Sequence, residues 1–130
     1  MIQVISYLQN KVKLSNVQFN YIYSEYPYDE IFTILRNIPD NDIVIMLPPN
    51  TIPTKKLLVN IVKKYKKEKN VSVFNENETD KSLINLSHDY FSPDDIIIFQ
   101  KSRFKYNKLP IPHMSDYNKI RDKIIRKCGN

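Results

Sequence analysis

The segment Asp40–Phe74 places the strongest limit on how this chain can fold. Residues 43–47 form a continuous apolar run, which is typical of a strand covered on both faces. A sharp turn follows at Pro48-Pro49-Asn50, an amphipathic helix begins near Thr54, and a second strand is predicted at Val71–Phe74. The turn therefore stands at the carboxyl end of a buried strand, where open α/β sheets bind their ligands.

Strand-like and helix-like patterns alternate through most of the chain. This alternation predicts an α/β fold, with 1–130 forming a single three-layer domain around a mainly parallel central sheet. The polar segment 75–82 is predicted to be a mobile loop, and 105–114 a connection to a last helix. Further strands are expected at Met1–Leu8, Val17–Tyr23 and Ile96–Gln100, and helices at Pro27–Pro39 and at 115–128 behind a Ser115 cap.

The composition excludes several classes of site. The single glycine, Gly129, lies at the tail, so the chain has no glycine-rich phosphate loop of the Walker or dinucleotide type. The single cysteine, Cys128, cannot form an internal disulfide, and no Cys/His cluster has zinc spacing. We therefore predict no metal site, and the sequence leaves the cofactor unknown.

The chain shows neither a signal-peptide pattern nor an apolar run of the roughly 18–20 residues that cross a bilayer. We expect no membrane span and a reducing, cytoplasmic location. The abundance of Asn, Ile, Lys and Tyr is associated with AT-rich genomes, which suggests a small viral genome and, in that case, the host cytoplasm.

Positive charge is concentrated in the second part of the chain. The net charge is +6, yet residues 1–50 carry three basic and five acidic side chains, whereas residues 51–130 carry seventeen and nine. Such a basic part favours an anionic partner, and a solvated lysine-rich helix face explains it equally well. A nucleic-acid surface would use Lys63, Lys64, Lys66 and Lys67 of one helix and Arg121 and Arg126 of the last one.

The segment from Asp42 to Val62 resembles the centre of the GT-A fold of family 2 glycosyltransferases. The resemblance rests on the strand Asp42–Leu47, the short turn, Thr51-Ile52-Pro53 and the apolar positions of the helix, and it extends loosely to Ile96–Phe104. The family's metal-binding Asp-x-Asp turn is replaced here by Pro48-Pro49-Asn50, which lacks the charged oxygen ligands that a hard cation prefers. The chain is also about half a typical member's length.

The resemblance implies a glycosyltransferase-like protein that takes a nucleoside-diphosphate sugar, either as a minimal enzyme or after losing metal-dependent catalysis. It implies that Glu25 lies near the base, that Asn50 and Thr51 lie near the phosphates, and that Lys101 or Arg103 neutralises the leaving diphosphate. Asp94 and Asp95, the adjacent carboxylate pair after Pro93, are the candidates for a catalytic base.

Each of these residues also has a structural interpretation. Asn50 and Thr51 can satisfy backbone groups in the turn, and Asp94 and Asp95 can simply form a turn. Acidic residues near Pro27 (Glu25, Asp29 and Glu30) suit the positive end of a helix dipole.

Two histidines complete the set of candidates. His88, next to Asp89, could be an oriented acid or base, but no nucleophile accompanies it or His113 in the sequence.

The alternative function is a non-enzymatic binding or assembly protein that contacts nucleic acid or a protein. Homodimerisation through an edge strand or the last helix is a further hypothesis, because the chain has nine tyrosines and six phenylalanines.

Overall fold

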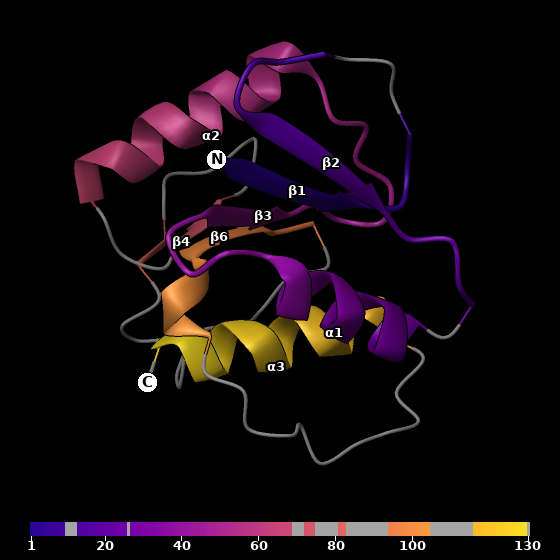
Figure 1. Ribbon diagram of the computed structural model, residues 1–130. Coiled ribbons are helices and arrows are strands. Elements are labelled where there is room, and N and C mark those ends of the chain that lie inside the picture. The colour runs from indigo at the N-terminus through magenta and orange to yellow at the C-terminus, as the bar shows by residue number, and fades with distance from the viewer. Residues whose placement is uncertain are drawn as a thin grey trace.

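A computed structural model describes residues 1–9, 13–25, 27–68, 72–74, 81–82, 94–104 and 116–129. Within them lie six strands, three α-helices and a short 3-10 helix (Figure 1). The strands are β1 (Ile2–Ser6), β2 (Val17–Tyr21), β3 (Ile43–Met46), β4 (Ser72–Phe74), β5 (Lys81–Ser82) and β6 (Ile96–Gln100). The helices are α1 (Pro27–Asn37), α2 (Lys55–Glu68), the 3-10 helix η2 (Lys101–Arg103) and α3 (Tyr117–Gly129).

The six strands form one mixed sheet in the order β2-β1-β3-β6-β4-β5. β1 pairs in parallel with both β2 and β3, whereas β6 is antiparallel to both β3 and β4. Strands β1 to β4 therefore run in one direction, and β5 and β6 run in the other. The α/β class and the predominance of one strand direction are confirmed.

The strand–helix–strand unit predicted over Asp40–Phe74 is present, with one difference. β3 and β4 are parallel to each other but not adjacent, because β6 lies between them. The apolar run at Ile96–Phe99 predicts a buried strand, but it does not predict whether that strand is parallel or antiparallel to its neighbours. A central strand shows the same apolar run in either orientation.

Each face of the sheet is covered by its own helices (Figure 1). On β3, Val44 and Met46 pack with α1 and α3, while Ile45 and the following Leu47 pack with α2. On β6, Ile97 and Phe99 face α1 and α3, and Ile96 and Ile98 face α2. The continuous apolar runs are thus explained by burial on both faces, as predicted.

The predicted helix starts are partly confirmed. Thr54 caps α2, since its Oγ1 accepts a hydrogen bond from the Leu57 amide at 3.2 Å. The last helix begins later than expected, and its cap is Asp116, whose Oδ1 accepts from the amides of Asn118 and Lys119. The predicted cap Ser115 and the connection 105–114 lie outside the described residues.

The predicted mobile loop 75–82 is wrong at its end, where Lys81–Ser82 forms strand β5 against β4. Residues 75–80 lie outside the described part of the chain. A two-residue strand is too short to show a period of alternation, so the sequence pattern could not reveal it.

We predict that Thr54→Ala lowers the free energy of unfolding by about 1 kcal/mol, because an amide of the first turn of α2 loses its side-chain acceptor. Urea denaturation followed by circular dichroism measures the change. Thr33→Ala is the matched control: Thr33 lies in the interior of α1 and its hydroxyl only donates back to the Asp29 carbonyl, so its loss is expected to be close to neutral. Equal losses in the two variants would contradict the capping role.

Candidate functional site

The sheet brings several of the predicted site residues to one edge, which we call the carboxyl edge. It is the edge where β1, β2 and β3 end and where β6 begins, because Met46 of β3 pairs with Ile97 of β6. Asn50 and Thr51 follow β3 there, and Asp94 and Asp95 precede β6. Glu25 follows β2 at the same edge, two strands away from β3.

The turn after β3 exposes Asn50. The Thr51 amide donates to the Pro48 carbonyl at 3.2 Å, which closes a four-residue turn. Pro48 is buried and Asn50 is exposed. The turn is therefore anchored by its first proline and presents the Asn50 amide group to solvent.

An aromatic pair fills the space beside this turn on the α1 and α3 side of the sheet. The Tyr117 hydroxyl donates to the Leu47 carbonyl at 2.8 Å, and the Tyr117 ring meets the Tyr7 ring edge-on at 4.7 Å between centroids. Burial raises the pKa of Tyr117 far above its usual value, so its hydroxyl stays protonated and can donate. A ligand at the carboxyl edge would consequently approach the exposed turn and the start of α2.

The two aspartates before β6 have different environments. Asp94 is exposed and Asp95 is buried. The Asp95 carbonyl accepts a hydrogen bond from Nη1 of Arg121, a fully buried side chain on α3. Burial lowers the pKa of Arg121, while the neighbouring Tyr117, Asp95 and Asp94 raise it. Asp95 therefore belongs to the contact between β6 and α3, whereas Asp94 is the exposed member of the pair.

Of the acidic residues around the start of α1, Glu30 makes structural hydrogen bonds and Glu25 is exposed. The Glu30 carboxylate accepts hydrogen bonds from the amides of Tyr23 and Ser24, at 2.9 and 2.8 Å. Glu30 thus ties the residues that follow β2 to the first turn of α1, a structural role that the helix-dipole interpretation did not predict. Glu25 is exposed at the carboxyl edge.

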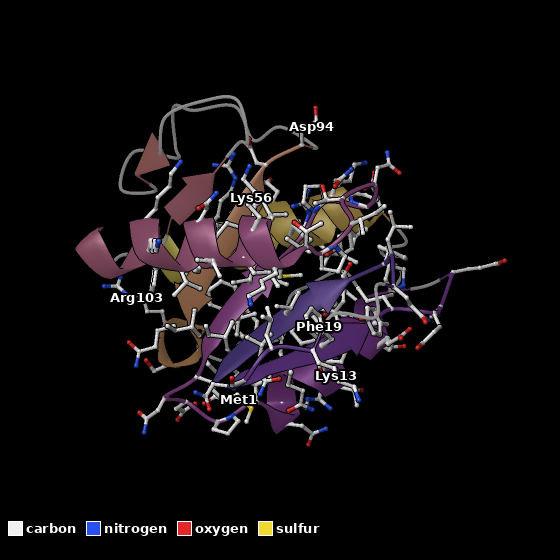
Figure 2. The ribbon with its side chains drawn as sticks, turned by 90° about the horizontal axis from the view of Figure 1, so that it is seen from above. Met1, Lys13, Phe19, Lys56, Asp94 and Arg103 are labelled. Atoms are coloured by element: carbon white, nitrogen blue, oxygen red, sulfur yellow. The ribbon has the colours of Figure 1, made fainter. Side chains whose placement is uncertain are left out.

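Lys101 and Arg103 lie at the opposite edge of the sheet. Because β6 is antiparallel to β3, its end meets the beginning of β3, and the Lys101 amide donates to the Asp42 carbonyl at 2.9 Å. Asp94 and Arg103 lie beyond the two ends of β6, and Figure 2 shows them well apart. The expectation that these two cations share a diphosphate with Asn50 is therefore wrong. The five-residue strand β6, about 17 Å long, separates Lys101 and Arg103 from the edge where Asn50 lies.

The buried Lys101 has a structural role. Its Nζ donates to the Ile38 carbonyl at 3.1 Å and forms an ion pair with the exposed Asp40 at 3.8 Å. These contacts join η2 to the segment between α1 and β3.

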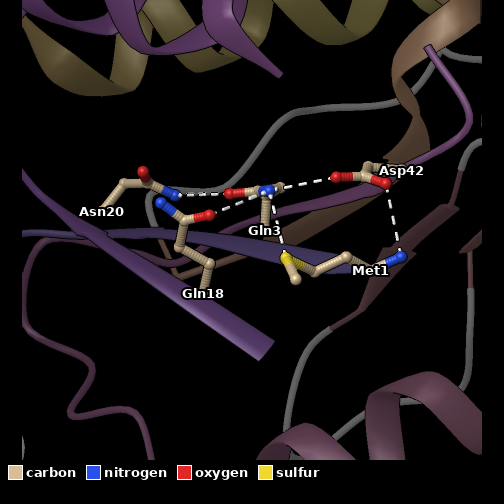
Figure 3. A network of polar contacts seen from close by, with 5 residues as sticks. All are labelled: Met1, Gln3, Gln18, Asn20 and Asp42. Carbon is tan, nitrogen blue, oxygen red and sulfur yellow. Dashed lines mark hydrogen bonds and ion pairs between the residues drawn. The ribbon is translucent and has the colours of Figure 1, made fainter. Parts of the chain in front are cut away.

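A chain of polar contacts crosses β2, β1 and the start of β3 near the edge opposite the carboxyl edge (Figure 3). The Gln3 side-chain amide donates to Oδ2 of Asp42 at 3.0 Å, and the Met1 ammonium group lies 3.3 Å from Oδ1. Gln3 also accepts from Asn20 at 3.1 Å and donates to Gln18 at 3.4 Å. The network links β2, β1 and the start of β3. The hydrogen bond from Gln3, followed by the contact with the ammonium group, holds the pKa of Asp42 below its usual value, and burial opposes this.

The basic residues predicted to form one surface do not do so. Lys63 and Lys64 are exposed on α2, but the side chains of Lys66 and Lys67 lie outside the described part of the chain. Arg121 is fully buried, and Arg126 forms an ion pair with Asp122 at 2.8 Å. Helices α2 and α3 also cover opposite faces of the sheet (Figure 1). The proposed extension from α2 to Arg121 and Arg126 is therefore wrong.

Sequence reasoning missed two further residues. Lys55 and Lys56 are exposed in the first turn of α2, close behind Asn50, and Figure 2 shows Lys56 near the start of that helix. A signal was present, because cations in a first helical turn oppose the helix dipole and are unfavourable for stability alone.

No group of side chains suited to a metal ion occurs among the described residues. His88 and His113 both lie outside that part of the chain. Cys128 is buried, and burial raises the pKa of its thiol to about 12, so it is no nucleophile. None of the helices described is both long and apolar enough to cross a membrane.

Comparisons with protein-family models, with curated proteins and with solved structures find no match to this chain.

We predict that Asp42→Asn lowers the free energy of unfolding by about 1 kcal/mol at pH 7, because a carboxylate acceptor is lost from the network. The pKa of Asp42 in the folded protein lies below its unfolded value of about 3.9. Its stabilisation is therefore complete above that value and is lost as the pH falls through the folded pKa.

Denaturation at a series of pH values should show a gap between wild type and Asp42→Asn that narrows below about pH 4. Asp40→Asn is the control, because Asp40 is 80% exposed and its ion pair contributes little. A gap that is constant with pH would show that the charge of Asp42 does not stabilise the fold.

Proposed function

We propose that this protein is a glycosyltransferase-like domain that binds a nucleoside diphosphate, or its sugar, at the carboxyl edge without an Asp-x-Asp metal site. The proposal includes a three-layer arrangement of the GT-A type, reduced to its nucleotide-binding part. The observation that carries it is that Asn50 and Thr51 follow β3, and Asp94 precedes β6, at the same edge of the sheet, with α2 beginning shortly after Thr51.

The order of elements supports this proposal. A central strand, a turn, an amphipathic helix and a further strand follow one another as β3, α2 and β4, and β6 comes later, as in the segments that carry the resemblance. Helix α2 covers one face of the sheet and α1 and α3 the other, which supports a three-layer arrangement.

The charges of the edge suit a diphosphate better than they suit a metal. Lys55 and Lys56 are exposed at the start of α2 and replace Lys101 and Arg103 as the cations next to Asn50. The first amides of α2 add the positive end of the helix dipole. Developing or fixed negative charge on phosphate oxygens needs such partners when no metal supplies them.

The carboxyl edge supports binding more than catalysis. Asp95 is buried against α3 by the hydrogen bond from Arg121, so the pair Asp94 and Asp95 does not work as two neighbouring carboxylates facing one ligand. Asp94 is the base candidate that stands open to solvent. We accordingly propose a nucleotide-binding protein in which catalysis, if retained, depends on Asp94.

We expect uridine or guanosine diphosphate to raise the melting temperature by several degrees at about 100 times its Kd, since a ligand of the native state stabilises it. Asn50→Ala and Lys56→Ala should each reduce the shift. Asn60→Ala, at an exposed amide on the middle of α2, is the matched control and should leave the shift unchanged. A melting temperature that no nucleotide moves, with or without manganese, would end the proposal.

A second candidate function is binding of nucleic acid by α2, favoured by the exposed lysines on that helix. The variant Lys63→Glu with Lys64→Glu should weaken binding to a single-stranded oligonucleotide. It should also lower the salt dependence of log K by roughly 0.7 for each phosphate that a lysine no longer neutralises. Fluorescence anisotropy over a series of salt concentrations measures both effects.

The control carries the same charge change on the opposite face of the sheet: Lys119→Glu with Lys123→Glu on α3. If both double variants weaken binding equally, the effect comes from net charge and not from α2.

A further inference from the structure

The two outer strands of the sheet differ in how well they are protected from pairing. β5 is only two residues long and contains Lys81, and a short, charged strand resists pairing with another chain. At the other end, β2 spans five residues, Val17-Gln18-Phe19-Asn20-Tyr21, with no charge and no proline. Among the described strands, β2 pairs with β1 alone.

The register of β2 shows which backbone groups face outward. The Ile2 amide donates to the Asn16 carbonyl at 2.8 Å, and the Ile22 amide donates to the Ser6 carbonyl at 2.9 Å. The backbone groups of successive residues alternate in direction along a strand. The backbone amides and carbonyls of Gln18 and Asn20 therefore also face β1, and those of Phe19 point away from the sheet.

The side chains of β2 form one apolar row and one amide row. Val17 and Phe19 pack partly against the core under α2, and the Phe19 and Tyr21 rings stack at 6.1 Å. Figure 2 shows Phe19 beside α2 and not beneath it. The other face carries the side chains of Gln18 and Asn20.

We infer that β2 pairs with β2 of a second copy of this chain, antiparallel and centred on Phe19, so that two sheets join into one. This register is self-complementary: Phe19 faces Phe19 of the second copy, Val17 faces Tyr21, and Gln18 faces Asn20. A shift of one residue would place the apolar row of one copy on the face of the amide row of the other.

The hydrogen bonds of the amide row agree with this pairing. Gln18 uses its Oε1 as acceptor for Gln3, and Asn20 uses its Nδ2 to donate to Gln3 and to the Val4 carbonyl. Within the part of the chain that is described, Nε2 of Gln18 and Oδ1 of Asn20 are left over, a donor and an acceptor. In the proposed register each donor faces the acceptor of the other copy, twice by symmetry.

The register also brings these side chains close together. Phe19 and its counterpart form a hydrogen-bonded pair, because their backbone groups point outward, with a Cα separation of about 5.5 Å. Gln18 and Asn20 of the other copy then form a non-hydrogen-bonded pair, where the Cα atoms approach to about 4.5 Å.

Disulfide trapping tests the contact and its register. Only a residue on the two-fold axis faces itself, and its Cα separation of about 5.5 Å is within disulfide reach. Phe19→Cys should give a covalent dimer under mild oxidation, whereas Gln18→Cys and Asn60→Cys should not. Cys128 is buried and does not compete. Covalent dimer from all three variants, or from none, would overturn the proposed register.

Sedimentation equilibrium tests the contact without crosslinking. Gln18→Glu keeps the acceptor for Gln3 but places a carboxylate against Oδ1 of Asn20, which should weaken dimerisation by about tenfold or more, since two symmetric pairs are removed together. Adding Asn20→Lys should restore dimerisation through a charge pair, and Asn60→Asp should leave it unchanged. A wild-type protein that stays monomeric at about 1 mM would refute the inference.

Discussion

Burial of the central strands on both faces is the constraint on which the rest of the structure depends. On one side the sheet must be covered over Ile45 of β3, the following Leu47, and Ile96 and Ile98 of β6. On the opposite side it must be covered over Val44, Met46, Ile97 and Phe99. Exposing either set would cost about 1.5–3 kcal/mol for each large aliphatic side chain. Helices are therefore required on both faces: α2 covers the first set of side chains, and α1 and α3 cover the second.

The two ends of the strands carry different chemistry as a result. At the beginning of β1 and β3, Gln3, Asp42 and Lys101 are buried and bound to one another or to the backbone, so this end is occupied by structural contacts. At the carboxyl edge, Asn50, Asp94 and the first lysines of α2 remain exposed. Polar groups that bind a ligand are to be sought at the second end, because those at the first are buried in structural contacts.

Local patterns predicted the elements well. The apolar runs at 43–47 and 96–99 indicated buried strands, Thr54 indicated the start of α2, and acidic residues near Pro27 indicated a helix start, where Asp29 and Glu30 lie in the first turn of α1. Each of these features is set by residues within a few positions of one another. They are therefore legible in the sequence without knowledge of the tertiary fold.

Features that depend on distant pairing were not predictable. The direction of β6 decides that Lys101 and Arg103 lie far from Asn50, and hydrophobicity does not encode direction. Arg121 looked like a surface cation, yet it is fully buried because Asn118, the Asp95 carbonyl and the Tyr117 ring surround its guanidinium group. Only the docking of α3 on the sheet creates those partners.

The insertion of β6 between β3 and β4 has a consequence for how the chain is made. A ribosome releases β3 and β4 before it releases residues 96–100, and neither strand can hydrogen-bond to the other in the final order. Until β6 is released, the side of β3 that will pair with β6 is an unprotected apolar edge. Chaperones should therefore be needed most while the nascent chain ends before β6. Folding is completed only when β6 pairs with both β3 and β4, which is a late, long-range step.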